Sequence, residues 1–166
     1  MRVRLIKRDD PERLAAAFAN AGWNKPRALF ERYLDEQQSG RRLGLVAEAD
    51  GRLAGYVTLV RRSAYAHFQE LGVPEIVDLN VLPMFQRRGI GTRLLDRAEE
   101  KASETSRQVG IAVGLHPGYN AAQRLYALRG YVPDGRGVTY KNRYLSEGDN
   151  VPLDDNLTLH LIKALR

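Results

Sequence analysis

The stretch that decides the fold runs Asp78-Leu79-Asn80-Val81-Leu82-Pro83-Met84-Phe85-Gln86-Arg87-Arg88-Gly89-Ile90-Gly91-Thr92-Arg93-Leu94-Leu95. A strand ends within it, Pro83 breaks that strand, and after a short loop a helix begins at the pair of glycines. The N-terminus of a helix presents unpaired N–H groups and a partial positive charge, which suit a phosphate. Gly89 and Gly91 lack the Cβ atoms that would block close approach of a ligand to the backbone. The stretch therefore predicts a strand–loop–helix unit that can hold an anion.

A short glycine pattern before a helix has several interpretations. This one lacks the Gly-Lys-Ser/Thr ending of the P-loop, which argues against nucleotide hydrolysis. It also lacks the third glycine of the dinucleotide fingerprint, and no βαβ unit begins the chain. A tight connection between strand and helix that holds no ligand would look the same. The pattern by itself leaves an anion site and a bare connection both open.

Outward from this stretch, the chain shows strand and helix patterns on both sides. The expected segments are a strand at Val3–Lys7, helices from Asp9 or Asp10 to Gly22 and from Asn24 to Gly40, strands Leu43–Ala49 and Arg52–Arg61 around an Asp50-Gly51 turn, strand Glu75–Leu82, helix Gly89–Ser106, strand Val109–Leu115, helix Ala121–Arg129, an extended segment from Tyr131, and strand Leu157–Ile162. The segment Tyr65–Val73 predicts either a loop facing substrate or a helical turn. The order β-α-α-β-β-β-α-β-α-β-β is that of a mixed α/β fold rather than a doubly wound sheet.

Length and composition limit the class of protein. The 166 residues suit a single domain over 1–166 with one sizeable core. The formal charge of +6 fits nucleic acid, an anionic cofactor or simply a solvated basic surface, but the basic residues are scattered singly and in pairs. The chain has no cysteine, no apolar run of membrane-spanning length and no signal-peptide pattern at its start. We therefore expect a cytoplasmic protein that binds neither nucleic acid nor membrane.

Two motifs in order resemble those of the GCN5-related N-acetyltransferase (GNAT) superfamily. Gln86-Arg87-Arg88-Gly89-Ile90-Gly91 is similar to its Gln/Arg-x-x-Gly-x-Gly/Ala signature, and it follows a strand and precedes an apolar helix. Leu125-Tyr126-Ala127-Leu128-Arg129-Gly130-Tyr131 resembles the family's Leu-Tyr-x-x-x-Gly-Phe/Tyr helix end. The resemblance implies the acyl-CoA N-acyltransferase-like fold, in which helices flank a central, mainly antiparallel sheet. It also implies acetyl-CoA as the acyl donor, with CoA as a product.

The resemblance assigns cofactor-binding roles to residues of this chain. The backbone of Leu79, Asn80 and Val81 would pair with pantetheine where the strand splays at a bulge. The pyrophosphate would rest on backbone N–H groups of the loop and first helical turn, which are those of Arg87, Arg88, Gly89, Ile90, Gly91 and Thr92. Many members also place an asparagine seven residues before the motif tyrosine. Here that position is Tyr119 and Asn120 is six residues away, so either residue could make the contact.

The resemblance also implies direct attack of an amine on the thioester. Because an ammonium must lose a proton first, a carboxylate working through water is the usual base, and Glu75 and Asp78 are the candidates. Either carboxylate could instead cap a strand or pair with an arginine. Tyr126 matches the tyrosine that donates a proton to the departing thiolate, although a core tyrosine would fit the same pattern. His116 could act as a base or substrate contact, or could be structural.

The acceptor is the least defined partner. Family members read it with the two N-terminal helices and the 65–73 segment, which contain Trp23, Tyr33, Tyr65, His67, Phe68, Gln69 and Glu70. The acidic residues Asp149, Asp154 and Asp155 could attract a cation. Scattered histidines give no metal site. We expect an N-acetyltransferase for a small-molecule or peptide amine, with a homodimer as an open possibility; a CoA-binding sensor without catalysis is the alternative.

Overall fold

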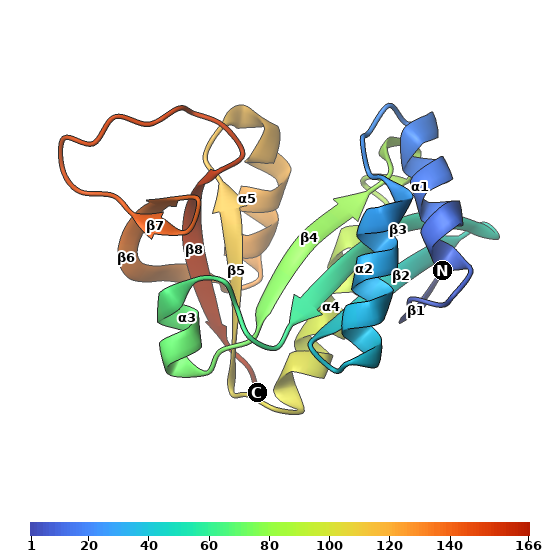
Figure 1. The fold of residues 1–166 in the computed structure, drawn as a ribbon, viewed down its shortest axis with the longest axis horizontal. Coiled ribbons are helices and arrows are strands. Elements are labelled where there is room, and N and C mark those ends of the chain that lie inside the picture. The colour runs from blue at the N-terminus through green and yellow to red at the C-terminus, as the bar shows by residue number, and fades with distance from the viewer. The chain divides into compact units, whose positions relative to one another are not determined.

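The computed structural model describes residues 1–166, and the chain folds into two compact units. The first unit comprises Met1–Arg61 and Ile76–Lys101, and the second comprises Arg62–Glu75 and Ala102–Arg166. Strands and helices contribute to both units (Figure 1), which confirms the mixed α/β class predicted from the sequence. No helix is long and apolar enough to span a membrane.

The first unit is built on four neighbouring strands in the order β1-β2-β3-β4. They are β1 (Arg2–Leu5), β2 (Arg42–Ala49), β3 (Arg52–Val60) and β4 (Glu75–Val81). β2 pairs antiparallel with both β1 and β3. The β2–β3 hairpin turns at Asp50 and Gly51, whose φ angles are 53° and 70°. Two consecutive positive φ values are those of a type I′ turn, as the Asp-Gly pair predicts.

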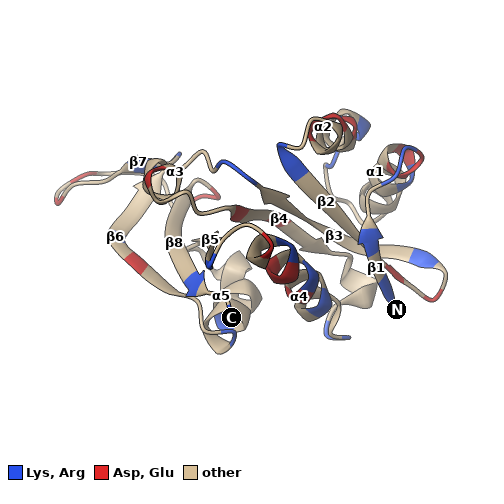
Figure 2. Cartoon of the chain, turned by 90° about the horizontal axis from the view of Figure 1, so that it is seen from below, with Lys and Arg blue, Asp and Glu red and all other residues tan.

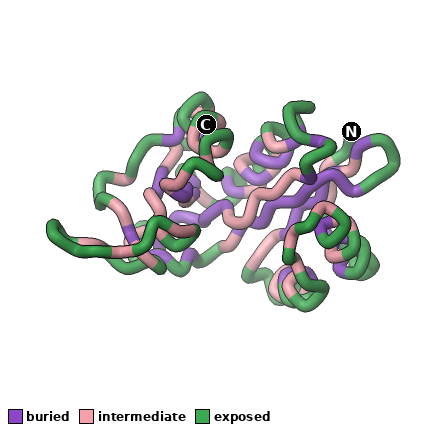
Figure 3. Tube along the Cα trace, turned by 90° about the horizontal axis from the view of Figure 1, so that it is seen from above, coloured by how far each residue is buried: buried purple, intermediate pink, exposed green.

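Helices cover both faces of these strands. α1 (Asp10–Asn20) and α2 (Arg27–Gln38) lie on one face, and α4 (Ile90–Ser103) lies on the other (Figure 2). The short helix η1 (Pro83–Phe85) connects β4 to the loop before α4. The apolar stripe of α4 is buried throughout, and comprises Ile90, Leu94, Leu95, Ala98 and Ala102. Burying apolar side chains is the main source of stability for an amphipathic helix. Figure 3 shows the buried segments following the strands, while the outer faces of the helices are exposed.

The second unit has the strand order β5-β8-β6-β7. These strands are β5 (Gln108–Gly114), β6 (Val132–Tyr140), β7 (Arg143–Tyr144) and β8 (Leu157–Ala164). β8 pairs antiparallel with β5 and β6, and β6 pairs antiparallel with β7. The helices of this unit are α3 (Ala66–Leu71), η2 (Pro117–Tyr119) and α5 (Asn120–Leu128). The mainly antiparallel sheet implied by the family resemblance is therefore observed.

One segment that the sequence left open and one unexpected strand complete the fold. The segment 65–73 contains the helix α3, which confirms the interpretation of this segment as a helical turn. Tyr65 and Phe68 are fully buried, so the alternative of a substrate-facing loop is wrong for these two rings, which belong to the core. A strand at β7 was not expected at all, because its two residues are too few to show a periodic pattern.

Candidate active site

The decisive stretch begins with an irregularity in β4 at Asp78. Its φ angle is 58°, in the left-handed region that residues other than glycine seldom adopt. A residue in this conformation interrupts the regular alternation of a strand, as in a β-bulge. The backbone of Leu79, Asn80 and Val81 follows directly along β4. The irregularity therefore lies where the family resemblance places the splayed strand.

After this irregularity, β4 approaches its neighbour β3 closely at Gly55. A Cβ atom added to Gly55 would lie 2.5 Å from the carbonyl oxygen of Asn80 and 3.1 Å from Cα of Val81. The backbone N–H of Leu82 donates to the carbonyl of Ala54 at 2.9 Å. Gly55 is thus required by packing at the end of β4, and sequence reasoning missed it because nothing local distinguishes it from any strand glycine.

A side chain anchors the loop that follows β4. Gln86 Nε2 donates a hydrogen bond to the carbonyl oxygen of Val81 at 3.0 Å. The next residues turn sharply, because Arg87 and Gly89 have φ angles of 60° and 76°. Gln86 is the first residue of the quoted signature, and its role in the structure is to hold the loop against the strand. The sequence alone did not predict this anchoring role of Gln86.

The anchored loop presents backbone to solvent at the start of α4. Arg87, Arg88, Gly89 and Thr92 are exposed, while Ile90 is buried beneath them. A Cβ added to Gly89 would meet no atom within 4 Å, so the space in front of the loop is open. The first turn of a helix leaves its N–H groups without intrahelical partners. These groups and the open space fit a phosphate group.

The arginine side chains of the loop are not all directed at this space. Arg88 Nη2 donates to Asp50 Oδ2 at 2.8 Å, and its guanidinium lies 5.4 Å from the centre of the Phe85 ring. Arg88 therefore ties the loop to the β2–β3 turn. This agrees with the expectation that main-chain groups, rather than the side chains at these positions, hold the anion.

Asp78 lies at the centre of a hydrogen-bond cluster. Its Oδ1 accepts from Lys25 Nζ at 2.7 Å and from Asn80 Nδ2 at 2.7 Å. Its Oδ2 accepts from the hydroxyls of Tyr33 at 2.8 Å and Tyr56 at 2.6 Å. Of the residues that the sequence analysis connected with the acceptor, Tyr33 is thus brought directly to a candidate catalytic carboxylate. Lys25 and Tyr56 complete the cluster, and no sequence pattern pointed to either of them.

The cluster controls the protonation of its members. Burial by itself raises the pKa of the Asp78 carboxyl, but the charge and hydrogen bond of Lys25 and the two tyrosine hydroxyls outweigh burial and lower it. Burial and the adjacent carboxylate raise the pKa of Tyr33 and of Tyr56. Asp78 is therefore an anion and both phenols are neutral at pH 7. A carboxylate with a lowered pKa is a weak base but a good partner for a cation.

The other candidate carboxylate belongs to the second unit. Glu75 is buried, and its Oε2 accepts a hydrogen bond from Ser63 Oγ at 2.5 Å. Ser63 Oγ in turn accepts from the backbone N–H of Tyr65 at 2.9 Å. Glu75 is thus held in place by a hydroxyl that is itself fixed by backbone. This arrangement neither assigns nor removes its expected role as a base.

Tyr126 lies on α5 and is buried. Burial, followed by the influence of Tyr119, raises its pKa. Its ring centre is 5.9 Å from that of Tyr131, and its backbone carbonyl accepts from the N–H of Tyr131 at 3.1 Å. The motif residues Tyr126 and Tyr131 are therefore packed together. A phenol that stays protonated at neutral pH retains the hydrogen that a proton donor needs.

Of the two candidates for the asparagine contact, Tyr119 has a packed ring and Asn120 is exposed. A Cβ on Gly114 would lie 2.3 Å from the ring of Tyr119, so the ring covers the end of β5. Asn120 begins α5 and is exposed. The side chain seven residues before Tyr126 therefore serves packing in this unit.

His116 stabilises a turn. Its Nδ1 accepts from the N–H of Gly118 at 3.1 Å, and its Nε2 lies 2.7 Å from Asp155 Oδ1. These contacts support the structural interpretation of His116 that the sequence left open. They also account for Asp155, one of the acidic residues considered for attracting a cation. No group of three or more His, Cys, Asp and Glu side chains could hold a metal ion.

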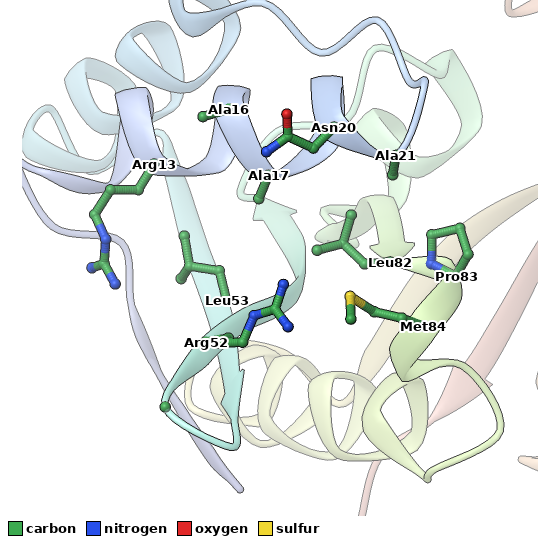
Figure 4. Close-up of a pocket in the computed structure, with 11 residues that line it drawn as sticks. Arg13, Ala16, Ala17, Asn20, Ala21, Arg52, Leu53, Leu82, Pro83 and Met84 are labelled. Carbon is green, nitrogen blue, oxygen red and sulfur yellow. The ribbon is translucent and has the colours of Figure 1, made fainter.

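A groove of about 740 Å³ also opens on the first unit. Figure 4 shows α1 forming one wall, with Arg13, Ala17 and Asn20, and Leu53 and Met84 facing it. None of the residues expected from the sequence to bind cofactor or to catalyse lines this groove. The candidate site therefore rests on β4, its loop and α4 rather than on the groove.

Comparison with known proteins identifies the family. The model of the acetyltransferase (GNAT) family matches residues 8–131, which is more than half of the chain, so the chain belongs to this family. An uncharacterized N-acetyltransferase of Archaeoglobus fulgidus is 37% identical over 83 residues. That match spans 50% of this chain and 55% of the relative, so the chain covers about half the length of this curated relative.

Solved structures share the fold across the whole chain. Ribosomal-protein-alanine N-acetyltransferase from Brucella melitensis has a TM-score of 0.72 at 19% identity, and the match covers 99% of this chain and 100% of that one. The structure of yncA from Salmonella typhimurium with its cofactor acetyl-CoA has a TM-score of 0.70 at 18% identity, covering 100% and 94%. Identities this low support the fold alone. The resemblance noted in the sequence is thus confirmed as family and as fold.

Proposed function

We propose that residues 1–166 form one acetyl-CoA-dependent N-acetyltransferase domain that transfers an acetyl group to an amine of a small molecule or peptide. One observation carries this proposal within the family: the loop held by Gln86 opens its backbone to solvent at the start of α4. Acetyl-CoA is also the cofactor in the Salmonella structure of the same fold. Structures of this fold include a ribosomal-protein-alanine N-acetyltransferase and an aminoglycoside 6'-N-acetyltransferase, so the acceptor of this chain has to be inferred from its own residues.

In this proposal, a strand and a loop of the chain bind different parts of the cofactor. The backbone of Leu79–Val81 follows the irregular residue Asp78 and would pair with the extended amide chain of pantetheine in the manner of an added strand. The loop and first helical turn, Arg87–Thr92, would hold the pyrophosphate on main-chain N–H groups. Asn120, which begins α5 and is exposed, stays the proposed side-chain contact to the cofactor, with Tyr119 as the alternative.

The reaction needs no covalent intermediate on the protein. The lone pair of the neutral amine attacks the thioester carbonyl carbon, the new C–N bond forms, and the C–S bond breaks. The proton lost by the amine passes to a carboxylate through water, and Tyr126 supplies a proton to the departing sulfur. The products are an N-acetylated amine and CoA. Tyr126 recovers its proton from solvent.

The different surroundings of the two carboxylates support different roles for them. Asp78 is saturated by four donors and has a lowered pKa, so it suits holding a cation better than removing a proton. We therefore propose that Glu75 is the general base and that Asp78 positions the acceptor. Measurement of turnover against pH in Glu75→Gln tests this division, because loss of a base removes the rising acidic limb of the profile.

Titration calorimetry with acetyl-CoA tests the cofactor site. The double variant Gly89→Glu, Gly91→Glu introduces side chains and negative charge into the loop, so we expect the wild type to bind with micromolar affinity and the variant to lose binding. Gly22→Glu, Gly40→Glu is a matched control, since both glycines have positive φ and end other helices. If the folded wild type does not bind acetyl-CoA, the proposal fails. Binding without turnover on a panel of amines would favour a CoA-binding regulatory module.

A further inference from the structure

Lys25 places an ammonium group on the carboxylate next to the proposed cofactor strand. Its Nζ lies 2.7 Å from Asp78 Oδ1 and 5.8 Å from the centre of the Tyr56 ring. A carboxylate beside an aromatic face is a favourable environment for an alkylammonium ion. Asp78 immediately precedes Leu79–Val81, the backbone proposed to hold pantetheine. The chain itself thus supplies an amine at this part of β4.

The site does not depend on Lys25 for its shape. Tyr33, Tyr56 and Asn80 all donate to Asp78, so three donors orient the carboxylate without help from Lys25. Tyr56 is itself packed edge-on against Phe18 and Phe30, at 5.2 Å and 5.0 Å between ring centres. A carboxylate fixed in this way would retain its geometry if Lys25 moved away.

Lys25 is placed where it can be displaced. It lies in the irregular connection between α1 and α2, so no helical hydrogen bond is broken when its side chain moves. The side chains of Lys25 and Asp78 are 23% and 19% exposed, which leaves the ion pair accessible from solvent. Asp78 also has an unfavourable φ angle of 58°. Strained residues of this kind are concentrated at functional sites.

We propose that Lys25 occupies the ammonium site of the acceptor, and that the acceptor is a primary alkylammonium compound that displaces it from Asp78. This inference rests on the proposed acetyltransferase function. Asp78 Oδ2 accepts from the two tyrosine hydroxyls, so the cation binds Oδ1, which it shares with the amide of Asn80. A guanidinium binds a carboxylate best through both oxygens, so this site favours an ammonium group. Lys25 therefore competes with the acceptor.

Binding of n-propylammonium to Lys25→Ala tests the ammonium site without any need for catalysis. This ion restores the carbons and nitrogen that the substitution removes beyond Cβ. We expect it to bind Lys25→Ala at least about tenfold more tightly than the wild type, measured by NMR titration and by a rise in thermal stability. The neutral isostere 1-propanol should not bind. Equal binding by wild type and variant, or no binding by a folded variant, would overturn the proposal.

Two further variants make the result specific. Adding Asp78→Asn to Lys25→Ala should abolish binding of n-propylammonium, and asparagine tolerates the left-handed backbone, so the fold is retained. Lys141→Ala removes another lysine that lies over a tyrosine ring, at 5.6 Å from Tyr140, and should create no site. Binding that persists without the Asp78 carboxylate would overturn the assignment.

Acetylation of n-propylamine links the site to the reaction. With acetyl-CoA present, Lys25→Ala should form N-acetylpropylamine with a KM at least about tenfold lower than that of the wild type. If Lys25→Ala binds both acetyl-CoA and n-propylammonium but does not join them, the acceptor role is overturned while the cofactor site stands. Failure of the wild type to bind acetyl-CoA is a separate observation, which would contradict the proposed function itself.

Discussion

At the scale of single residues, the surroundings of a side chain decide which proton-transfer role it can take. Asp78 and Tyr126 have opposite requirements, since the first must stay charged and the second must keep its hydrogen. Donors around Asp78 lower its pKa, while burial raises the pKa of Tyr126. Both shifts hold each group in the state that suits its proposed task at neutral pH.

The role of Tyr126 leads to a prediction for Tyr126→Phe. Phenylalanine preserves the buried ring but removes the proton donor, so we expect kcat to fall by about 100-fold while the Kd for acetyl-CoA changes little. Steady-state kinetics and calorimetry measure the two quantities. Tyr131→Phe, in which a second buried tyrosine 5.9 Å away loses its hydroxyl, is the control and should keep more activity. Normal turnover in Tyr126→Phe would remove this residue from the mechanism.

At the scale of elements, the end of β4 is shaped by its contacts with β3 and with the following loop. Gly55 allows the two strands to approach, and Gln86 holds the loop to Val81. Neither residue carries out chemistry. Both determine where the backbone of Leu79–Val81 and the start of α4 lie, and a binding site built on main-chain groups depends on that placement.

The packing at Gly55 predicts a large effect from a single methyl group. In Gly55→Ala the new Cβ would lie 2.5 Å from a backbone oxygen, which cannot move without shifting β4. We expect a loss of about 1–3 kcal/mol in the free energy of unfolding, together with weaker acetyl-CoA binding. In Gly44→Ala the nearest atom, at 2.9 Å, belongs to the side chain of Ile6, so the cost should be smaller. Denaturant titration compares the two variants, and an equal or smaller cost at Gly55 would contradict the account.

At the scale of the whole molecule, the two compact units have different kinds of interior. The first unit surrounds a charged carboxylate with tyrosines, whereas the second buries a neutral histidine. His160 is fully buried and stacks on Tyr65 with ring centres 3.6 Å apart. Burial lowers the pKa of His160 to about 4. His160 is therefore neutral in the folded second unit above that pH.

The buried histidine predicts a loss of stability in mild acid. The unfolded chain binds a proton on His160 near pH 6.5 and the folded chain only near pH 4, so the unfolding free energy falls as pH drops between these values. The loss should be on the order of 3 kcal/mol. Urea titrations at pH 7.5 and 4.5 measure it. His160→Phe retains an aromatic ring but cannot titrate. If this variant loses as much unfolding free energy as the wild type between the two pH values, the prediction is refuted.

Much of the fold follows from local patterns in the chain. The Asp50-Gly51 pair specifies its hairpin, and the spacing of Ile90, Leu94, Leu95 and Ala98 specifies the buried side of α4. The start of α1 shows the limit of such reasoning. Asp10 resembles a helix cap, but its fully buried carboxylate accepts from Arg4 at 2.6 Å. The carboxylate of Asp10 is thus bound by a side chain of β1, six positions earlier, although its local context indicated a capping role.

The sequence by itself determined the class of the fold, the family and the position of the loop that we propose binds an anion, because each depends on residues close together in the chain. Only the tertiary structure decided what surrounds Asp78. Its partners Tyr56, Tyr33 and Lys25 are 22, 45 and 53 positions away, on a strand, a helix and a connection. No periodicity relates positions so far apart, since their meeting depends on how the elements pack. Through that packing, the carboxylate of Asp78 is held as an anion and is paired with the ammonium group of Lys25.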